Sequence, residues 1–142
     1  MMVSTPPWLT LGRSCEDCLA IVRQSDREVY VARDGETVAG FIILSMRGAF
    51  PGYIQIICVA ERMRGCGVGS QLMKFAEERI FHETPNAFIC VSSFNSGARK
   101  LYERLGYRVV GDLEDYLVSG YAETFMRKSI APIDEFKKRH KR

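Results

Sequence analysis

The stretch of sequence that decides the fold is a glycine-rich run, Arg64-Gly65-Cys66-Gly67-Val68-Gly69-Ser70. An apolar, strand-like segment precedes it over residues 54–59, and apolar residues with helical spacing follow over 68–81. Alternate glycines leave the loop almost without side chains, so that a ligand can approach the backbone closely. The first N–H groups of a helix are unpaired, and its dipole favours negative charge there. Together with the cationic Arg64, the loop predicts a cradle for a phosphate-bearing ligand.

The spacing of the glycines limits which phosphate ligand this could be. A nucleoside-triphosphate loop needs a lysine before Ser or Thr, and the run has none. The dinucleotide fingerprint Gly-x-Gly-x-x-Gly would place its third glycine on Ser70 or on Leu72, and neither residue is a glycine. The remaining pattern is Arg64-x-x-Gly67-x-Gly69. Taken alone, it fits an ordinary glycine-rich turn as well as a binding loop.

A second motif lies downstream, in residues 95–107, and first predicts a short helix with both ends marked. Asn95 is a favoured N-cap residue, and Gly106 suits the left-handed position after a helix. Between them, apolar side chains recur with helical spacing at Ala98, Leu101, Tyr102 and Leu105. The segment therefore predicts a helix that packs one face against a core.

The two motifs together resemble the GNAT N-acetyltransferases. Arg64-x-x-Gly67-x-Gly69 resembles this family's acyl-coenzyme A pyrophosphate loop, and residues 95–107 resemble its signature Asn-x-x-Ala-x-x-Leu-Tyr-x-x-x-Gly-Phe/Tyr. The resemblance spans about residues 27–128. It implies an enzyme that takes acetyl-CoA as cofactor and moves the acetyl group to a primary amine, on a small molecule or a peptide N-terminus. Transfer would proceed by direct attack in a ternary complex.

The resemblance also implies which residues hold the cofactor. The pantetheine arm would pair with backbone at the end of the central strand, where the N–H of Val59 would orient the thioester carbonyl. Asn95 would cap its helix and contact the cofactor. The implied cofactor-binding residues are Cys58, Val59, Ala60, Arg64, Gly65, Cys66, Gly67, Val68, Gly69, Ser70 and Asn95.

For catalysis, the family's acid position falls on Tyr102, which is protonated at neutral pH and can donate to the departing thiolate. Packing in the apolar stripe explains the same residue, and one tyrosine can serve both roles. The general base stays unassigned, because Tyr53 and Gln55 stand where many members carry a glutamate. Glu61 fits better as a loop residue, so water ordered by Gln55 is the remaining route.

The acceptor pocket is expected at residues 112–123, which resemble the loop between the family's last two strands. Acidic side chains and two tyrosines in this segment suit a cationic amine. A solvated surface loop explains the same composition equally well.

The order of the predicted elements indicates an α/β fold. Helices are expected over 15–24, 68–81 and from 95, and strands over 28–33, 37–45, 53–59, 87–92, 107–111 and 121–128. They form an α+β sandwich, whose mixed, mostly antiparallel central sheet has about six to seven strands flanked by helices, as in the GNAT family. The N-terminal strand would be shortened, since only residues 8–11 could supply it. Residues 1–131 are expected to form a single domain and residues 132–142 a basic C-terminal tail.

Composition places the chain among globular proteins, with 46% hydrophobic and 26% charged residues. The formal net charge is +3 and the excess lies in the tail, so we expect no nucleic-acid partner and a solvated tail. No apolar run reaches the ~20 residues of a membrane span, and no export signal opens the sequence. Five scattered cysteines predict no metal site and a reduced, cytoplasmic setting.

Two interpretations other than catalysis stay open. The glycine loop would equally serve a non-catalytic acyl-CoA-binding sensor or regulatory module, and the missing strand carboxylate favours that alternative. An RNA-associated protein would instead depend on residues 132–142. Pairing of exposed edge strands into a homodimer is expected by analogy alone.

Overall fold

The computed structural model describes residues 1–2 and 12–141, so the strand expected over 8–11 lies outside the described residues. In chain order the elements are α2 (Cys15–Val22), β1 (Arg27–Asp34), β2 (Thr37–Ser45), β3 (Tyr53–Val59), the 3-10 turn η2 (Glu61–Met63), α3 (Val68–Glu83), β4 (Asn86–Ser92), α4 (Ser96–Arg104), β5 (Arg108–Leu113), β6 (Glu123–Ser129) and α5 (Ile133–His140). Each helix and strand predicted within the described residues is present, with small shifts at the ends.

The strands form one six-stranded sheet in the order β1-β2-β3-β4-β6-β5. All neighbours are antiparallel except β3 and β4, which are parallel. The predicted fold class, a mostly antiparallel sheet flanked by helices, is therefore confirmed.

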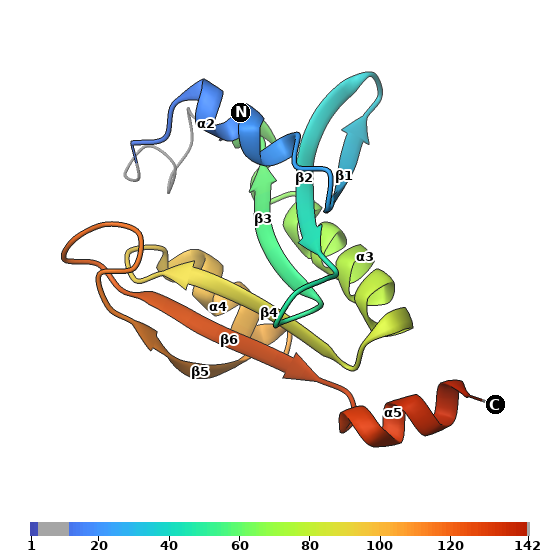
Figure 1. The fold of residues 1–142 in the computed structure, drawn as a ribbon. Helices are drawn as coiled ribbons and strands as arrows, with labels where there is room; N and C mark the ends of the chain where they lie inside the picture. Colours follow the sequence, from blue (N-terminus) through green and yellow to red (C-terminus); the bar gives the residue numbers. More distant parts are fainter. Residues whose placement is uncertain (3–11, 142) are drawn as a thin grey trace.

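The helices cover the two faces of the sheet unequally (Figure 1). The main core lies between the sheet and the pair α3 and α4, which both contribute to it. A smaller cluster packs α2 against the opposite face of β2 and β3. Fully or almost fully buried members of the main core include Ile42, Leu44, Ile54, Leu72, Met73, Ala76, Ile80, Ile89, Tyr102 and Met126.

The central feature of the sheet is an opening between β3 and β4. These strands pair only at Tyr53↔Phe88 and Ile54↔Ile89, and beyond those residues they diverge, as Figure 1 shows. At the closed end, Gly52 has φ +91 and no room for a Cβ, because the Asn86 carbonyl lies against it. The sheet is thus fixed at one end and open at the carboxyl ends of both strands.

The basic C-terminal segment differs from the expected solvated tail, because residues 133–140 form helix α5. Phe136 is only 6% exposed, and it lines a small cavity together with Met46, Thr84 and Pro85. Acidic residues in the first turn and basic residues in the last turn match the helix dipole. The proposed domain boundary at residue 131 stays a prediction. Across residues 1–2 and 12–141, every helix is too short or too polar to cross a membrane.

Candidate functional site

The glycine loop and the start of α4 enclose a cavity of about 560 Å³. Gly67 is the N-cap of α3 and has no side chain to accept a hydrogen bond. The first N–H groups of the helix, which face this space, therefore have no capping side chain as a partner. Gly65 and Gly67 adopt positive φ angles of 74° and 83°, a conformation that other residues enter at a cost. The cavity is lined by Val59, Met63, Arg64, Gly65, Gly67, Val68, Gly69, Ser70, Asn95, Gly97, Ala98, Leu101 and Arg104.

Two arginines give this cavity positive charge. Arg64 was expected there, whereas Arg104, in the last turn of α4, was not. Neither forms an ion pair with any residue in the part of the chain that the structure describes. The sequence shows Arg104 only as a polar helix residue, and its place at the cavity depends on how α4 docks. The pair makes the cavity suited to a ligand with several negative charges.

The expected role of the β3 backbone can be followed in its hydrogen bonds. The Ala60 N–H donates to the Ala39 carbonyl of β2 at 2.8 Å. Because alternate N–H groups of an extended chain point to opposite edges, the N–H of Val59 points away from β2. It therefore faces the opening, where β4 has already diverged. Cys58, by contrast, packs its side chain in the smaller cluster under α2, so only its backbone lies near the opening.

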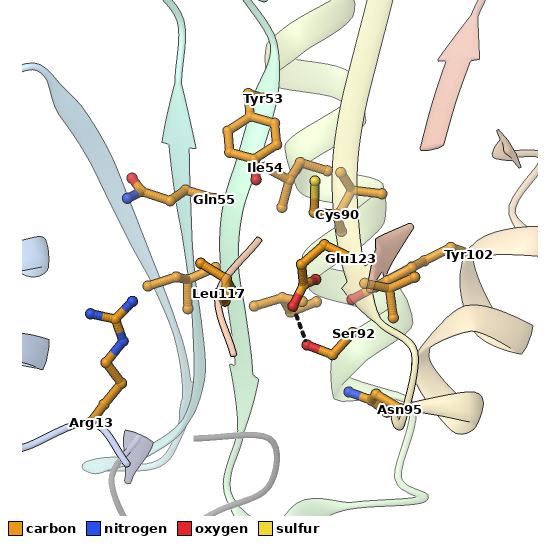
Figure 2. A pocket seen from close by; sticks show the side chains of 14 residues that line it. Arg13, Tyr53, Ile54, Gln55, Cys90, Ser92, Asn95, Tyr102, Leu117 and Glu123 are labelled. Atoms are coloured by element: carbon orange, nitrogen blue, oxygen red, sulfur yellow. Dashed lines mark hydrogen bonds between the residues drawn. The ribbon is translucent and has the colours of Figure 1, made fainter. Parts of the chain in front are cut away.

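A cleft of about 120 Å³ lies between the separated halves of β3 and β4, and Figure 2 shows Glu123, Ser92 and Tyr102 together on its β4 side, with Gln55 and Arg13 on the other. It joins residues from five elements or their flanking loops. Asn95 lines this cleft and also the glycine-loop cavity, so the two spaces adjoin. The polar lining of the cleft comprises Arg13, Tyr53, Gln55, Cys90, Ser92, Asn95, Tyr102 and Glu123.

Tyr102 and Asn95 bring α4 to the cleft. Tyr102 is 5% exposed, and burial raises the pKa of its hydroxyl, which is therefore protonated at neutral pH. Within the described residues the hydroxyl has no hydrogen-bond partner, so it is available to a ligand. Asn95 Oδ1 accepts the Ala98 N–H at 3.2 Å, which confirms the predicted helix cap. The Asn95 side-chain amide N–H groups remain for the cavity.

Glu123 is the carboxylate that the sequence did not single out. It lies at the start of β6, is 5% exposed, and accepts a hydrogen bond from Ser92 Oγ at 2.5 Å. Burial raises the pKa of this carboxyl, and the Ser92 hydrogen bond opposes that shift in part. Among the described lining residues it is the sole carboxylate of the cleft. The pairing of Ser92 with Glu123 across β4 and β6 creates this site.

The residues considered earlier for base chemistry are placed differently. Gln55 lines the cleft, but its Oε1 accepts from Arg27 Nε at 2.7 Å. Its carbonyl oxygen thus accepts from Arg27, and the ordering of water by Gln55 stays a prediction. Glu61 is exposed in η2 and lines neither cavity. Cys90, expected as a core residue, instead faces the cleft, where burial raises the pKa of its thiol.

The segment expected to form an acceptor pocket, residues 112–123, contributes Glu123 at its end and otherwise Leu113, Tyr116 and Leu117. Leu113 and Tyr116 line a third cavity, of about 370 Å³, and Leu117 lines the cleft. Two of its acids make structural hydrogen bonds: Asp112 of β5 accepts from the Thr124 hydroxyl of β6, and Asp115 in the loop accepts from the Gly120 N–H. The third cavity is lined by Ser45, Arg47, Ala49, Phe50, Tyr53, Cys90, Leu113, Tyr116 and Phe125.

The cysteines form no metal site within the described part of the chain, where no cluster of three or more metal-binding side chains occurs. Cys15 and Cys66 are exposed and Cys18 is buried. Cys66 lies in the glycine loop with its thiol 3.8 Å from the Arg64 carbonyl.

Comparison with known sequences gives a consistent result. Residues 4–107 match the Acetyltransferase (GNAT) family. A protein of Agrobacterium fabrum named as an acetyltransferase is 31% identical over 108 residues, covering 75% of this chain and 69% of that protein. A protein of Methanocaldococcus jannaschii named as an uncharacterized N-acetyltransferase is 34% identical over 101 residues, covering 70% of this chain and 64% of that protein.

Solved structures share the fold. The Escherichia coli ribosomal-protein-S18-alanine N-acetyltransferase gives a TM-score of 0.70 at 16% identity, over 90% of this chain and 92% of that one. An aminoglycoside 6'-N-acetyltransferase complexed with coenzyme A gives a TM-score of 0.69 at 15% identity, over 91% of this chain and 94% of that one. A Bacillus anthracis structure in complex with acetyl coenzyme A gives a TM-score of 0.68 at 22% identity, over 77% of this chain and 65% of that one. At these identities the likeness is one of fold.

Proposed function

Because the chain belongs to the acetyltransferase (GNAT) family, we propose that it transfers an acetyl group from acetyl-CoA to a primary amine. The observation that carries the proposal is the cleft between β3 and β4. There a buried tyrosine hydroxyl, Tyr102, and a buried carboxylate, Glu123, face one space beside a cavity suited to phosphates. A positioned acid and a positioned base that reach the same thioester would both accelerate acetyl transfer.

The glycine-loop cavity would hold the pyrophosphate of acetyl-CoA. The N–H groups that open α3 would donate to it, with Arg64 and Arg104 supplying positive charge. The Val59 N–H, which points into the opening, would pair with the pantetheine arm and bring the thioester carbonyl into the cleft. Of the remaining predicted contacts, Asn95 lines both the cavity and the cleft, whereas Cys58, Ala60 and Cys66 line neither, and their contacts with the cofactor stay predictions.

Glu123 is the group that we assign to the acceptor. A buried carboxylate attracts an ammonium ion, and its raised pKa makes it a better proton acceptor once the amine is bound. The neutral nitrogen then attacks the thioester carbon, a C–N bond forms and the C–S bond breaks. Tyr102, kept protonated by burial, donates its proton to the departing sulfur. Amide formation also releases the second proton of the nitrogen, which re-protonates the Tyr102 phenolate, and the proton taken up by Glu123 returns to solvent, so that both groups are restored.

The test is acetyl-CoA turnover on a panel of primary amines and peptides, with Tyr102→Phe as the decisive variant. Loss of a positioned acid typically costs about 10²–10⁴-fold in rate, and we expect a loss in this range with acetyl-CoA affinity unchanged. Tyr107→Phe is the matched control, because Tyr107 is equally buried and does not line the cleft. Tight acetyl-CoA binding without turnover on any acceptor would support the sensor alternative instead.

A further inference from the structure

We propose that the acceptor is a small monoamine with an aromatic group, and that this group occupies the third cavity, framed by Phe50, Tyr116 and Phe125. The proposal rests on the function given above and names the substrate class of the same site. Its basis is the position, chemistry, charge and size of this cavity relative to Glu123.

The third cavity continues the cleft. Tyr53 and Cys90 line both spaces, so a ligand can extend from one into the other. The pairs Ser92↔Glu123 and Cys90↔Phe125 are successive on the same face of β4 and β6. Residues two apart in a strand lie about 7 Å from each other. A nitrogen at Glu123 and an aromatic ring at Phe125 would therefore be joined by a short alkyl chain.

The walls of this cavity are aromatic and already assembled. The Phe50 ring lies 5.2 Å from Phe88 and 5.4 Å from Phe125, and the rings of Phe88 and Phe125 stack at 5.5 Å. Such packing fixes the rings without a ligand. Phe50 is nonetheless 53% exposed and Tyr116 62% exposed, so both rings can still bury apolar surface against an occupant.

The charges around the cavity argue against polycationic acceptors. Among its described lining residues, Arg47 is the sole charged side chain and no carboxylate is present. A second ammonium group on the acceptor would meet Arg47 without a negative partner. Asp112 and Asp115 already accept hydrogen bonds, from the Thr124 hydroxyl and from the Gly120 N–H. The site therefore accommodates an acceptor with a single ammonium group, which lies against the Glu123 carboxylate.

The volume of the cavity favours a small molecule over a peptide. An apolar cavity of about 150 Å³ holds benzene, and the space here is about 370 Å³. It accommodates one aromatic group with its alkyl chain, and the further residues of a peptide would extend beyond it. We therefore expect a free arylalkylamine to be a better substrate than a peptide that begins with Phe.

The experiment measures kcat/KM for acetyl-CoA-dependent acetylation of phenethylamine, ethylamine, spermidine and a short peptide beginning with Phe. Burial of a phenyl-sized group predicts that phenethylamine exceeds ethylamine by about 10- to 100-fold. Phe50→Ala, in a solvent-exposed loop, should reduce this ratio by at least about 5-fold. Tyr121→Ala is the matched aromatic control, because Tyr121 lies in the acceptor loop and lines neither cavity. Its ratio should equal that of the wild type.

A charge reversal tests the monoamine part independently, since Arg47→Glu should raise kcat/KM for spermidine relative to phenethylamine. Equal turnover of ethylamine and phenethylamine, or a preference for spermidine or the peptide, would overturn the inference while acetyl transfer itself stands. It would also be overturned if Phe50→Ala kept the wild-type ratio of kcat/KM for phenethylamine to kcat/KM for ethylamine. Failure to acetylate any amine, with acetyl-CoA bound, would refute the proposed function and this inference with it.

Discussion

Replacing Glu123 by Gln should separate activity from stability in this protein. Glutamine has nearly the same shape and keeps an oxygen that can accept the Ser92 hydroxyl, which lies 2.5 Å from Glu123 Oε1. The variant thus keeps the contacts of the cleft and loses the negative charge and the ability to take up a proton. Since a positioned base typically contributes about 10²–10⁴-fold, we expect kcat/KM for the best amine to fall by at least about 100-fold.

The stability of the same variant should move in the opposite direction. Burial raises the folded-state pKa of Glu123 above its unfolded value, so the folded state binds this proton more tightly. The corresponding stabilisation is complete below the unfolded pKa and is lost as pH rises through the folded pKa. At neutral pH the ionised side chain therefore costs stability, and Gln removes that cost. We expect the Tm of Glu123→Gln at pH 7 to equal or exceed that of the wild type, with the difference shrinking toward pH 4.

Two assays decide this prediction, thermal unfolding between pH 4 and 8 and the pH dependence of kcat/KM. The kcat/KM of the wild type should fall as the pH is lowered, with an apparent pKa above the ordinary carboxyl range. The residual activity of the variant should not show this fall at acid pH. Glu77→Gln is the control. Glu77 pairs with Lys128 at 2.7 Å outside the cleft, so its loss should lower Tm and spare kcat. Activity of Glu123→Gln within about 3-fold of the wild type, with the acid limb intact, would refute the base assignment.

Three further predictions concern the cofactor cavity and α5. Arg104→Gln should raise the Kd of acetyl-CoA by about 10-fold, the loss of one charge-assisted hydrogen bond; Arg99→Gln, on the same helix but outside the cavity, should leave calorimetric Kd unchanged. Gly67→Ala, at φ 83°, should cost about 1–2 kcal/mol in urea unfolding, and an unchanged midpoint would contradict the strain argument. Phe136→Ala should cost about 3 kcal/mol and speed tryptic cleavage of α5, whereas Glu135→Ala, at an exposed position of the same helix that does not line the small cavity beside Phe136, should do neither.

The elements that the sequence predicted are those whose signal is local. The α3 stripe is apolar at helical spacing and is buried as expected, and Asn95 caps α4 through its own side chain. Helix α5 was missed because its apolar contact rests mainly on Phe136, set among charged residues that resemble a solvated tail. A single buried aromatic residue gives too weak a periodicity to predict a helix.

The parts of the site that sequence reasoning missed depend on pairing between distant segments. Glu123 meets Ser92 across 31 positions of sequence, through the register of β4 with β6. Gln55 was considered for ordering water, but Arg27, a residue of the edge strand β1, engages its oxygen. Arg104 reaches the glycine-loop cavity through the docking of α4. No local pattern marks any of these contacts, since each depends on strand pairing or helix docking between distant segments.

The same topology explains how this chain can lack a carboxylate on β3 and still place one in the cleft. Because β3 and β4 are parallel, their carboxyl ends lie at the same edge of the sheet, where they diverge. Because β6 is antiparallel to β4, its amino end lies at that edge as well. A side chain at the start of β6 can therefore reach the same opening as a side chain on β3, but from the opposite wall. Glu123 occupies this position, so in the proposed mechanism the base comes from the wall of the cleft opposite β3, and the acid, Tyr102, comes from α4.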